Sequence, residues 1–359
     1  MTADDTYAAA GVDTGEAGKA VSALVEVLET IDPGRPRSRV VGAGHYASVL
    51  ALDERMGLAL CTDGVGTKLI VAEQAGRFDT VGIDCVAMNV NDLVCVGAQP
   101  LAMLDYLAVE RADPEVLAAV GRGLKEGAER ARIEIPGGEL AQVPEMLRGH
   151  PSPHGLDLVG AAVGVVALDR IVTGDRIAPG NALLGLPSSG LHSNGFTLAR
   201  RALLEQGGLR LDESPPELGR TVADELLEPT EIYVRAIGDL LAADVEVYGL
   251  AHITGDGLLN LLRLNPAAGF EIDGPLPAQP VFALIAELGA VPEAEMQRVF
   301  NMGTGFVCVT AQDEAEGALE VLRRHHPDAA RIGNVTAEAG TVRLPEAALV
   351  GDASGFREL

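Results

Sequence analysis

Residues 58–71 read LALCTDGVGTKLIV. An apolar run ends near residue 62, the hexapeptide DGVGTK occupies residues 63–68, and apolar residues then resume. The first run predicts a strand that ends at the hexapeptide. The hexapeptide itself is expected to form the turn between this strand and a following helix.

Two interpretations of the hexapeptide are open: an ordinary surface turn, or a loop that holds a metal and a polyphosphate. Glycines let the backbone approach a ligand, exposed N–H groups bind phosphate oxygens, and a lysine adds positive charge. Asp63 would hold Mg²⁺, a hard cation that prefers carboxylate and phosphate oxygens. The phosphate-binding candidates are Gly64, Gly66, Thr67 and Lys68. The spacing does not match the Walker A loop.

Composition excludes several classes of protein. The chain has 359 residues, of which 47% are hydrophobic, so it can form one large or two medium domains. A net charge of −25 makes nucleic acids and anionic membranes poor partners. No apolar run approaches the roughly 18 residues of a membrane span, and residues 1–15 lack an export-signal pattern, so we expect a cytoplasmic protein. The cysteines are expected to be small buried hydrophobes: Cys61, Cys85, Cys95 and Cys308.

The order of predicted elements indicates two α+β halves. In the first half, strands and helices are expected to alternate, at residues 58–62, 80–99, 100–109, 113–132 and 158–168. Turn residues cluster at 169–181, where we place the boundary. The predicted domains are therefore residues 1–170 and residues 171–359.

The helix predicted at residues 80–99 has an unusual polar side. Its apolar residues share one face, whereas Asp84, Asn91 and Asp92 lie outside it. An ordinary amphipathic helix with its polar side in water would explain this pattern. However, a solvated face normally carries Lys, Arg or Glu, and the segment contains none of them. We therefore favour a face covered by something else, with carboxylates that are paired or bound to a metal.

Three further residues of the first half are candidates for the same site. Gly138 and Glu139 follow a short predicted strand, where an acid after two glycines suits a third metal ligand or, alternatively, a tight turn with an exposed acid. Asp105 interrupts the apolar run 100–109, and a buried acid needs a partner, such as Mg²⁺ or a substrate hydroxyl.

In the second half, the segment SSGLHSNGF, residues 188–196, is predicted to join a strand to a helix. Helix N-termini favour anions, and His192 can transfer a proton near neutral pH. Ser193 and Asn194 follow it directly. His252, in AHITGDG, has the same predicted position. For both histidines, a purely structural role is the alternative.

Nine segments together resemble one enzyme family. They occur in the family's order between Tyr7 and about residue 345: YAAAGVD, TDGVGTK, GIDCVAMNVNDLV, GAQPLAMLDY, GGE, SSGLHSNGF, EPTEIYV, AHITGDG and FNMGTGF. The family is aminoimidazole ribonucleotide synthetase, also called phosphoribosylformylglycinamidine cyclo-ligase. The resemblance implies a homodimer whose N-terminal α+β domains pair their sheets, with a C-terminal α/β domain beside each. It also implies ATP and Mg²⁺, and closure of the imidazole ring of formylglycinamidine ribonucleotide in purine biosynthesis.

The resemblance also implies roles for the candidate residues. Mg²⁺ would be held by Asp63, Asp92 and Glu139. The nucleotide and substrate would be bound by the glycine-rich hexapeptide and by Asp84, Asn91, Asp105, Gly138, Ser193 and Asn194. Acid–base catalysis would fall to His192 and His252, with Asp92 in the catalytic group.

The chain departs from the family pattern at positions near these motifs: Val25, His45, Tyr46, Leu140, Gln142 and Asp256. The departures leave two alternatives. One is a related ATP-dependent enzyme of the same superfamily that activates an amide or acts as a kinase. The other is a nucleotide-binding dimer that has lost catalysis.

Overall fold

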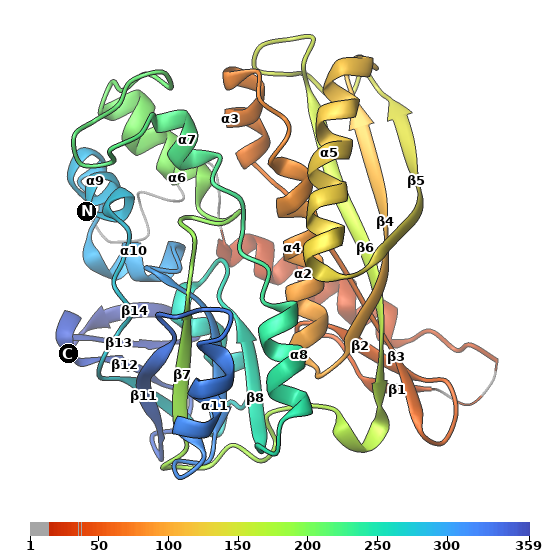
Figure 1. The fold of residues 1–359 in the computed structure, drawn as a ribbon, viewed down its shortest axis with the longest axis vertical. Helices are drawn as coiled ribbons and strands as arrows, with labels where there is room; N and C mark the ends of the chain where they lie inside the picture. The colour runs from red at the N-terminus through yellow and green to blue at the C-terminus, as the bar shows by residue number, and fades with distance from the viewer. Residues whose placement is uncertain (1–13, 35, 37) are drawn as a thin grey trace.

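The computed structural model describes residues 14–34, 36 and 38–359 and contains two β-sheets with helices packed against them (Figure 1). The motif at residues 7–13 lies outside the described residues. Sheet plus helices in each half confirms the predicted fold class. In the described ranges, no helix has both the length and the apolar composition needed to cross a bilayer.

The first sheet has six strands in the order β1-β2-β3-β6-β4-β5. Its neighbours pair antiparallel except β4 and β5, which are parallel. The strands are β1 (Arg39–Val41), β2 (Ser48–Ala51), β3 (Met56–Gly64), β4 (Gln99–Val109), β5 (Glu134–Gln142) and β6 (Leu156–Ala167). The helices of this half are α2 (Thr14–Glu29), α3 (Lys68–Ala75), α4 (Val81–Cys95) and α5 (Pro114–Ala131).

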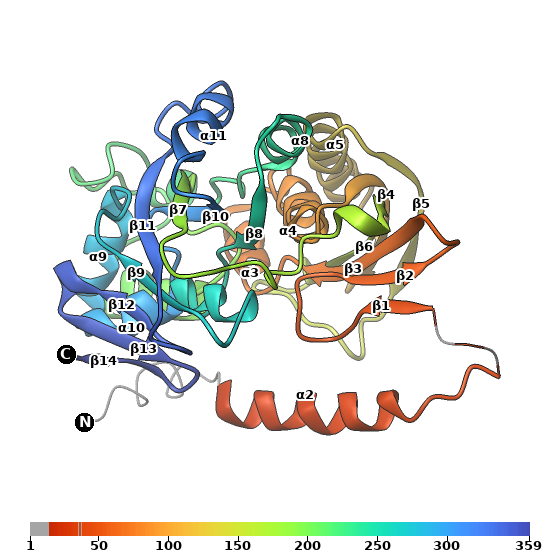
Figure 2. The ribbon, with the colours of Figure 1, turned by 90° about the horizontal axis from the view of Figure 1, so that it is seen from below.

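Helices α4 and α5 cover one face of this sheet (Figure 2). They pack closely because glycines face each other: a Cβ at Gly82 would lie 2.2 Å from the backbone nitrogen of Leu124. Helix α5 begins as its sequence predicts, since the Asp113 side chain accepts the backbone N–H of Glu115 at 3.0 Å and Pro114 occupies the first turn.

Within the described residues, the opposite face of the sheet, which we call the uncovered face, leaves side chains of β4 exposed. Large apolar side chains alternate with buried ones along β4, and Leu104 and Tyr106 are 52% and 44% exposed. Leu140 on the neighbouring edge strand β5 is exposed as well, but it pairs with buried Leu107 and therefore lies on the face toward the helices. Large apolar side chains exposed together on one face of a sheet, as Leu104 and Tyr106 are, are typical of a protein–protein interface.

The second sheet has eight strands in the order β14-β13-β12-β9-β11-β7-β10-β8, and only β9 and β12 pair in parallel. The strands are β7 (Ala182–Pro187), β8 (Val247–His252), β9 (Gly269–Ile272), β10 (Thr304–Thr310), β11 (Ala330–Thr336), β12 (Val342–Leu344), β13 (Leu349–Asp352) and β14 (Gly355–Glu358). The helical segments are η1 (Leu168–Arg170), α6 (Phe196–Arg200), η2 (Arg201–Gln206), α7 (Val222–Leu226), α8 (Val234–Ala242), η3 (Gly257–Arg263), α9 (Pro280–Gly289), α10 (Glu293–Val299), α11 (Ala315–Leu322) and η4 (Pro345–Ala347).

The two sheets are joined by residues 168–181, between β6 and β7. The domain boundary predicted at residue 170 falls in this connection and stays a prediction. Figures 1 and 2 both place β8 and α8 beside α4, so the buried helix of the first half also contacts the second half. The candidate residues lie on both sides of this contact.

Candidate active site

The hexapeptide forms the predicted strand–turn–helix, with β3 ending at Gly64 and α3 beginning at Lys68. Gly66 adopts a φ of 70°, a conformation that favours glycine. Asn89 of α4 fixes the end of β3: its amide donates to the Asp63 carbonyl and accepts the Asp63 N–H, both at 3.1 Å. The start of the loop is therefore rigidly attached to the helix that supplies the other carboxylates.

Asp63 and Asp92 form a pair of like charges at the domain contact. Burial, followed by the nearby charge of Asp92, raises the pKa of Asp63 to about 6. A hydrogen bond from the Gly64 N–H at 2.7 Å only partly offsets this rise. Two neighbouring carboxylates with little counter-charge are a suitable donor set for a divalent cation.

His252 holds the Asp92 carboxylate in place. The ring is fully buried, and its Nδ1 lies 3.0 Å from Asp92 Oδ1. Its Nε2 lies 3.4 Å from the Asn91 amide nitrogen, which can only donate. Nε2 must therefore accept, so Nδ1 carries the hydrogen and donates it to Asp92. With both nitrogens engaged and no solvent access, His252 does not fit the predicted acid–base role and instead orients a carboxylate.

Lys68 does not fit the predicted role of phosphate ligand. Its ammonium is fully buried and forms an ion pair of 2.9 Å with Asp84. It also donates to the backbone carbonyls of His192 and Glu228 at 3.1 and 2.6 Å. Because its three hydrogens are used inside the protein, Lys68 links the two halves of the chain.

Asp84 and Asn91 serve the same contact, which corrects their predicted role in nucleotide binding. Asp84 accepts both the N–H and the hydroxyl of Thr230 at 2.7 Å. Asn91 donates to the Glu231 carbonyl at 2.8 Å and accepts the Tyr233 N–H at 3.0 Å. The polar face of α4 is indeed covered, as predicted, but mostly by the segment before α8 in the same chain.

His192 lies in the turn between β7 and α6 with a φ of 61°. Its Nε2 accepts the Ser189 N–H at 3.2 Å, so the neutral ring carries its hydrogen on Nδ1. That buried Nδ1 has no hydrogen-bond partner within the described ranges. Burial, with smaller effects of His252 and Lys68, lowers the pKa of His192 well below its usual value. His192 is thus a neutral hydrogen-bond donor.

The residues that follow His192 differ in how far they are engaged. The Ser193 hydroxyl lies 3.2 Å from the Thr230 hydroxyl. The Asn194 amide nitrogen is buried and has no partner among the residues that the structure describes. Asn194 therefore keeps a donor available for a ligand.

Glu139 does not join Asp63 and Asp92 within one subunit. In the sheet order, β5 is separated from β3 by three strand spacings, roughly 14 Å in all. Glu139 pairs with Tyr106, whose side chain lies on the uncovered face, whereas Gly138 pairs with Asp105 on the face toward α4. In the described part of the chain, no three His, Cys, Asp or Glu side chains converge as a metal site. The predicted three-carboxylate site is therefore reduced to two carboxylates.

Asp105 and Gly138, both predicted to bind the nucleotide or substrate, are direct partners on neighbouring strands. A Cβ at residue 138 would lie 2.3 Å from Asp105 Oδ1, so only glycine leaves space for this carboxylate. Burial raises the pKa of Asp105. Asp105 and Asp63 both pair with Gly160, which places them in one row across the sheet.

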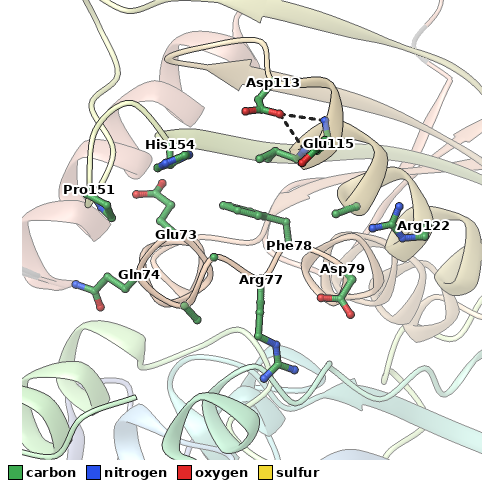
Figure 3. Close-up of a pocket in the computed structure, with 14 residues that line it drawn as sticks. Glu73, Gln74, Arg77, Phe78, Asp79, Asp113, Glu115, Arg122, Pro151 and His154 are labelled. Atoms are coloured by element: carbon green, nitrogen blue, oxygen red, sulfur yellow. Dashed lines mark hydrogen bonds between the residues drawn. The ribbon is translucent and has the colours of Figure 1, made fainter. Parts of the chain in front are cut away.

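A separate cavity of about 680 Å³ lies between the end of α3 and the start of α5 (Figure 3). It contains none of the predicted site residues. Its charged groups serve the local structure: Glu73 accepts the N–H groups of His150 and Leu156, and Arg77 forms an ion pair with Asp224. We therefore place the candidate site at the domain contact.

Comparison with known structures first defines the class of fold. The hydrogenase maturation protein HypE of Escherichia coli aligns with a TM-score of 0.59 at 24% identity, over 84% of each chain. HypE in complex with ATP gives 0.60 at 22% identity, over 82% of this chain and 83% of that one. AaThiL complexed with AMPPCP and TMP gives 0.61 at 17% identity, over 91% and 92%. These likenesses show a shared fold.

Comparison with protein families is more specific. Residues 44–166 match the N-terminal domain of AIR synthase related proteins, and residues 178–344 match the C-terminal domain. The chain belongs to the AIR synthase related family. Phosphoribosylformylglycinamidine cyclo-ligase of Methanothermobacter thermautotrophicus is 46% identical over 340 residues, which is 94% of this chain and 96% of that protein. The enzyme of the same name from Thermococcus kodakarensis is 46% identical over 93% and 96%.

Proposed function

We propose that this chain catalyses the ATP-dependent ring closure of formylglycinamidine ribonucleotide to aminoimidazole ribonucleotide. Relatives named for this activity match nearly the whole chain. The observation that carries the proposal is the pair Asp63 and Asp92, held beside the glycine-rich loop with a raised Asp63 pKa. The fold is shared with proteins solved with ATP and with AMPPCP.

The reaction needs little covalent chemistry from the protein. The terminal phosphoryl group of ATP passes to the amide oxygen of the substrate, and ADP leaves. The amidine nitrogen of the same molecule then attacks the activated carbon and loses a proton. A C–N bond forms, and the C–O bond breaks with release of phosphate. Catalysis of such steps depends mainly on positioning and on neutralisation of charge.

The residues divide these tasks. Asp63 and Asp92 would hold Mg²⁺, which supplies positive charge next to the phosphates. The backbone of Gly64 and Gly66 remains the candidate for phosphate oxygens, with the Thr67 hydroxyl beside it. His192 would donate its Nδ1–H, which has no partner among the described residues, to the substrate, and Asn194 would donate its amide hydrogen.

We also propose that the uncovered face of the first sheet pairs with a second copy of the chain. Exposed Leu104 and Tyr106 support this pairing, and it would bring Glu139, which pairs with Tyr106 on the same face, to the interface. Sedimentation should give a dimer, and Leu104→Glu should shift it to a monomer. A monomeric parent protein would refute the pairing. We further propose that the chain divides into two domains at residue 170. We also propose a cytoplasmic location, because all four cysteines are free thiols.

An assay with pure protein, formylglycinamidine ribonucleotide, ATP and Mg²⁺ tests the activity directly. We expect aminoimidazole ribonucleotide and ADP in equal amounts, and no product without Mg²⁺. Tight ATP binding without product would instead favour the nucleotide-binding dimer that has lost catalysis. ATP turnover only with a different acceptor would favour a related enzyme of the superfamily.

A further inference from the structure

A small polar pocket of about 270 Å³ lies in the second half of the chain, next to the candidate site. It is lined by Asn194 from the turn before α6, by Thr254, Gly255 and Asp256 from the loop after β8, and by Arg263 and Arg298. Sites for whole drug-sized ligands measure about 300–1,000 Å³, so this pocket suits one small group better than an entire nucleotide.

The charges in the pocket favour an anion. The side chains that line it include the guanidinium groups of Arg263 and Arg298 and the carboxylate of Asp256. The Arg263–Asp256 pair is long, at 3.9 Å, and the Arg263 side chain is 43% exposed. This guanidinium therefore remains accessible to a ligand, and planar guanidinium groups bind phosphate oxygens with two hydrogen bonds.

Two further features point to a ligand. The amide nitrogen of Asn194, which has no hydrogen-bond partner in the described part of the chain, provides a buried donor on the pocket wall. Arg263 is oriented by the aromatic ring of Tyr46 in the first half, 5.5 Å from the guanidinium carbon, and the Tyr46 hydroxyl donates to the Asn260 carbonyl at 3.2 Å. A donor set fixed from both halves of the chain is typical of a preformed site.

The charge of the pocket residue Arg263 also acts on Asp63 of the carboxylate pair. The charge of Arg263 opposes the rise in the pKa of Asp63, so the two groups lie within electrostatic reach. A molecule whose phosphate occupied the pocket would extend toward Asp63 and Asp92. A ribose 5-phosphate with the reacting group at the other end of the sugar has this shape.

We propose that this pocket binds the 5′-phosphate monoester of the ribonucleotide substrate, with Arg263 as its main charged ligand and Asn194 as a hydrogen-bond donor. This assignment rests on the proposed function, because it presumes a ribonucleotide substrate. Asp256 lowers the affinity of the pocket by competing for Arg263. The polyphosphate of the nucleotide binds separately, at the glycine-rich loop.

The test uses titration calorimetry on two variants with opposite expected effects on ribonucleotide affinity. Each variant is titrated with ligands that have or lack the 5′-phosphate. Arg263→Gln should weaken binding of formylglycinamidine ribonucleotide about 10- to 100-fold, as expected for a charged hydrogen bond. Binding of the corresponding ribonucleoside, which lacks the phosphate, and of the ATP analogue AMPPNP with Mg²⁺ should not change. Asp256→Asn should tighten ribonucleotide binding about two- to five-fold. Asparagine tolerates the φ of 72° at this position, so this variant is expected to fold.

Arg331→Gln, which removes an exposed arginine that is paired with Asp273 and does not line the pocket, is the control and should change nothing. The proposal is overturned if Arg263→Gln weakens the ribonucleotide and the ribonucleoside equally, or if it weakens AMPPNP instead. It is also overturned if Asp256→Asn weakens ribonucleotide binding. Failure of the proposed function would look different, since the parent protein would then bind no ribonucleotide and form no product.

Discussion

The glycine-rich hexapeptide and helix α4 meet in two charged pairs, one of opposite charges and one of like charges. Lys68 of the loop and Asp84 of α4 make a closed ion pair with no solvent access. Asp63 of the loop and Asp92 of the same helix make a like-charge pair, and the Asp92 side chain is 17% exposed. The first pair is complete in the folded chain, whereas Asp63 of the second forms no ion pair with a basic side chain in the described ranges. One sequence motif therefore contributes Lys68 to a structural contact and Asp63 to a candidate ligand site.

Breaking the closed pair should produce the largest effect, and it should appear as a loss of stability. Removal of one partner of a buried pair costs about 3–5 kcal/mol because it leaves an unpaired buried charge. We expect this loss for Lys68→Met and for Asp84→Asn in chemical denaturation. The combined variant should recover part of the loss. Lys125→Met, at an exposed pair with Glu129, is the control and should change little. Equal stability of all these variants would contradict the account.

The like-charge pair of Asp63 and Asp92, which we call the open pair, should instead affect turnover more than stability. Asp92→Asn should lower turnover by at least about 100-fold, equivalent to about 2.7 kcal/mol in the barrier, while the protein remains folded. Turnover assays and thermal melting on the same sample separate the two effects. Near-normal rates would remove Asp92 from the site.

The neighbour of the open pair offers a finer comparison. The amide nitrogen of asparagine can occupy the position of the His252 Nδ1, and that of glutamine the position of Nε2. We therefore expect His252→Asn to retain the affinity for Mg²⁺–AMPPNP within about three-fold and His252→Gln to lose about ten-fold. A general acid–base role predicts a different result, namely equal loss of turnover in both variants with unchanged affinity.

The smallest effect concerns pH. A carboxyl whose pKa is raised to about 6 in the folded state favours folding less as the pH rises from about 4 to 6. Without metal, Asp63→Asn should therefore melt at a higher temperature than the parent at pH 8, and this difference should vanish near pH 4. Added Mg²⁺ should stabilise the parent more at pH 8 than at pH 5. A pH-independent difference would argue against the raised pKa.

The sequence predicted the fold well because its signals are local. Asp113 before Pro114 marks the start of α5, and the interrupted apolar run at residues 58–71 marks the strand, turn and helix. The family resemblance is confirmed by relatives that cover most of the chain.

The sequence did not separate the two kinds of carboxylate, because both need a partner and the partner is distant. Lys68 meets the carbonyl of Glu228, 160 residues away, and only the folded chain reveals this contact. Glu139 fails as a partner of Asp63 because the alternation of β5 places it on the other face of the sheet. Arg263 has no motif around it that distinguishes it from a surface arginine.

The central claim is that Asp63 and Asp92 together bind a divalent cation. Titration of Mn²⁺ in the presence of AMPPNP, followed by electron paramagnetic resonance, tests it most directly. The account predicts that Asp63→Asn and Asp92→Asn each weaken Mn²⁺ binding at least about 100-fold while AMPPNP alone still binds. Unchanged Mn²⁺ affinity in either folded variant would contradict it.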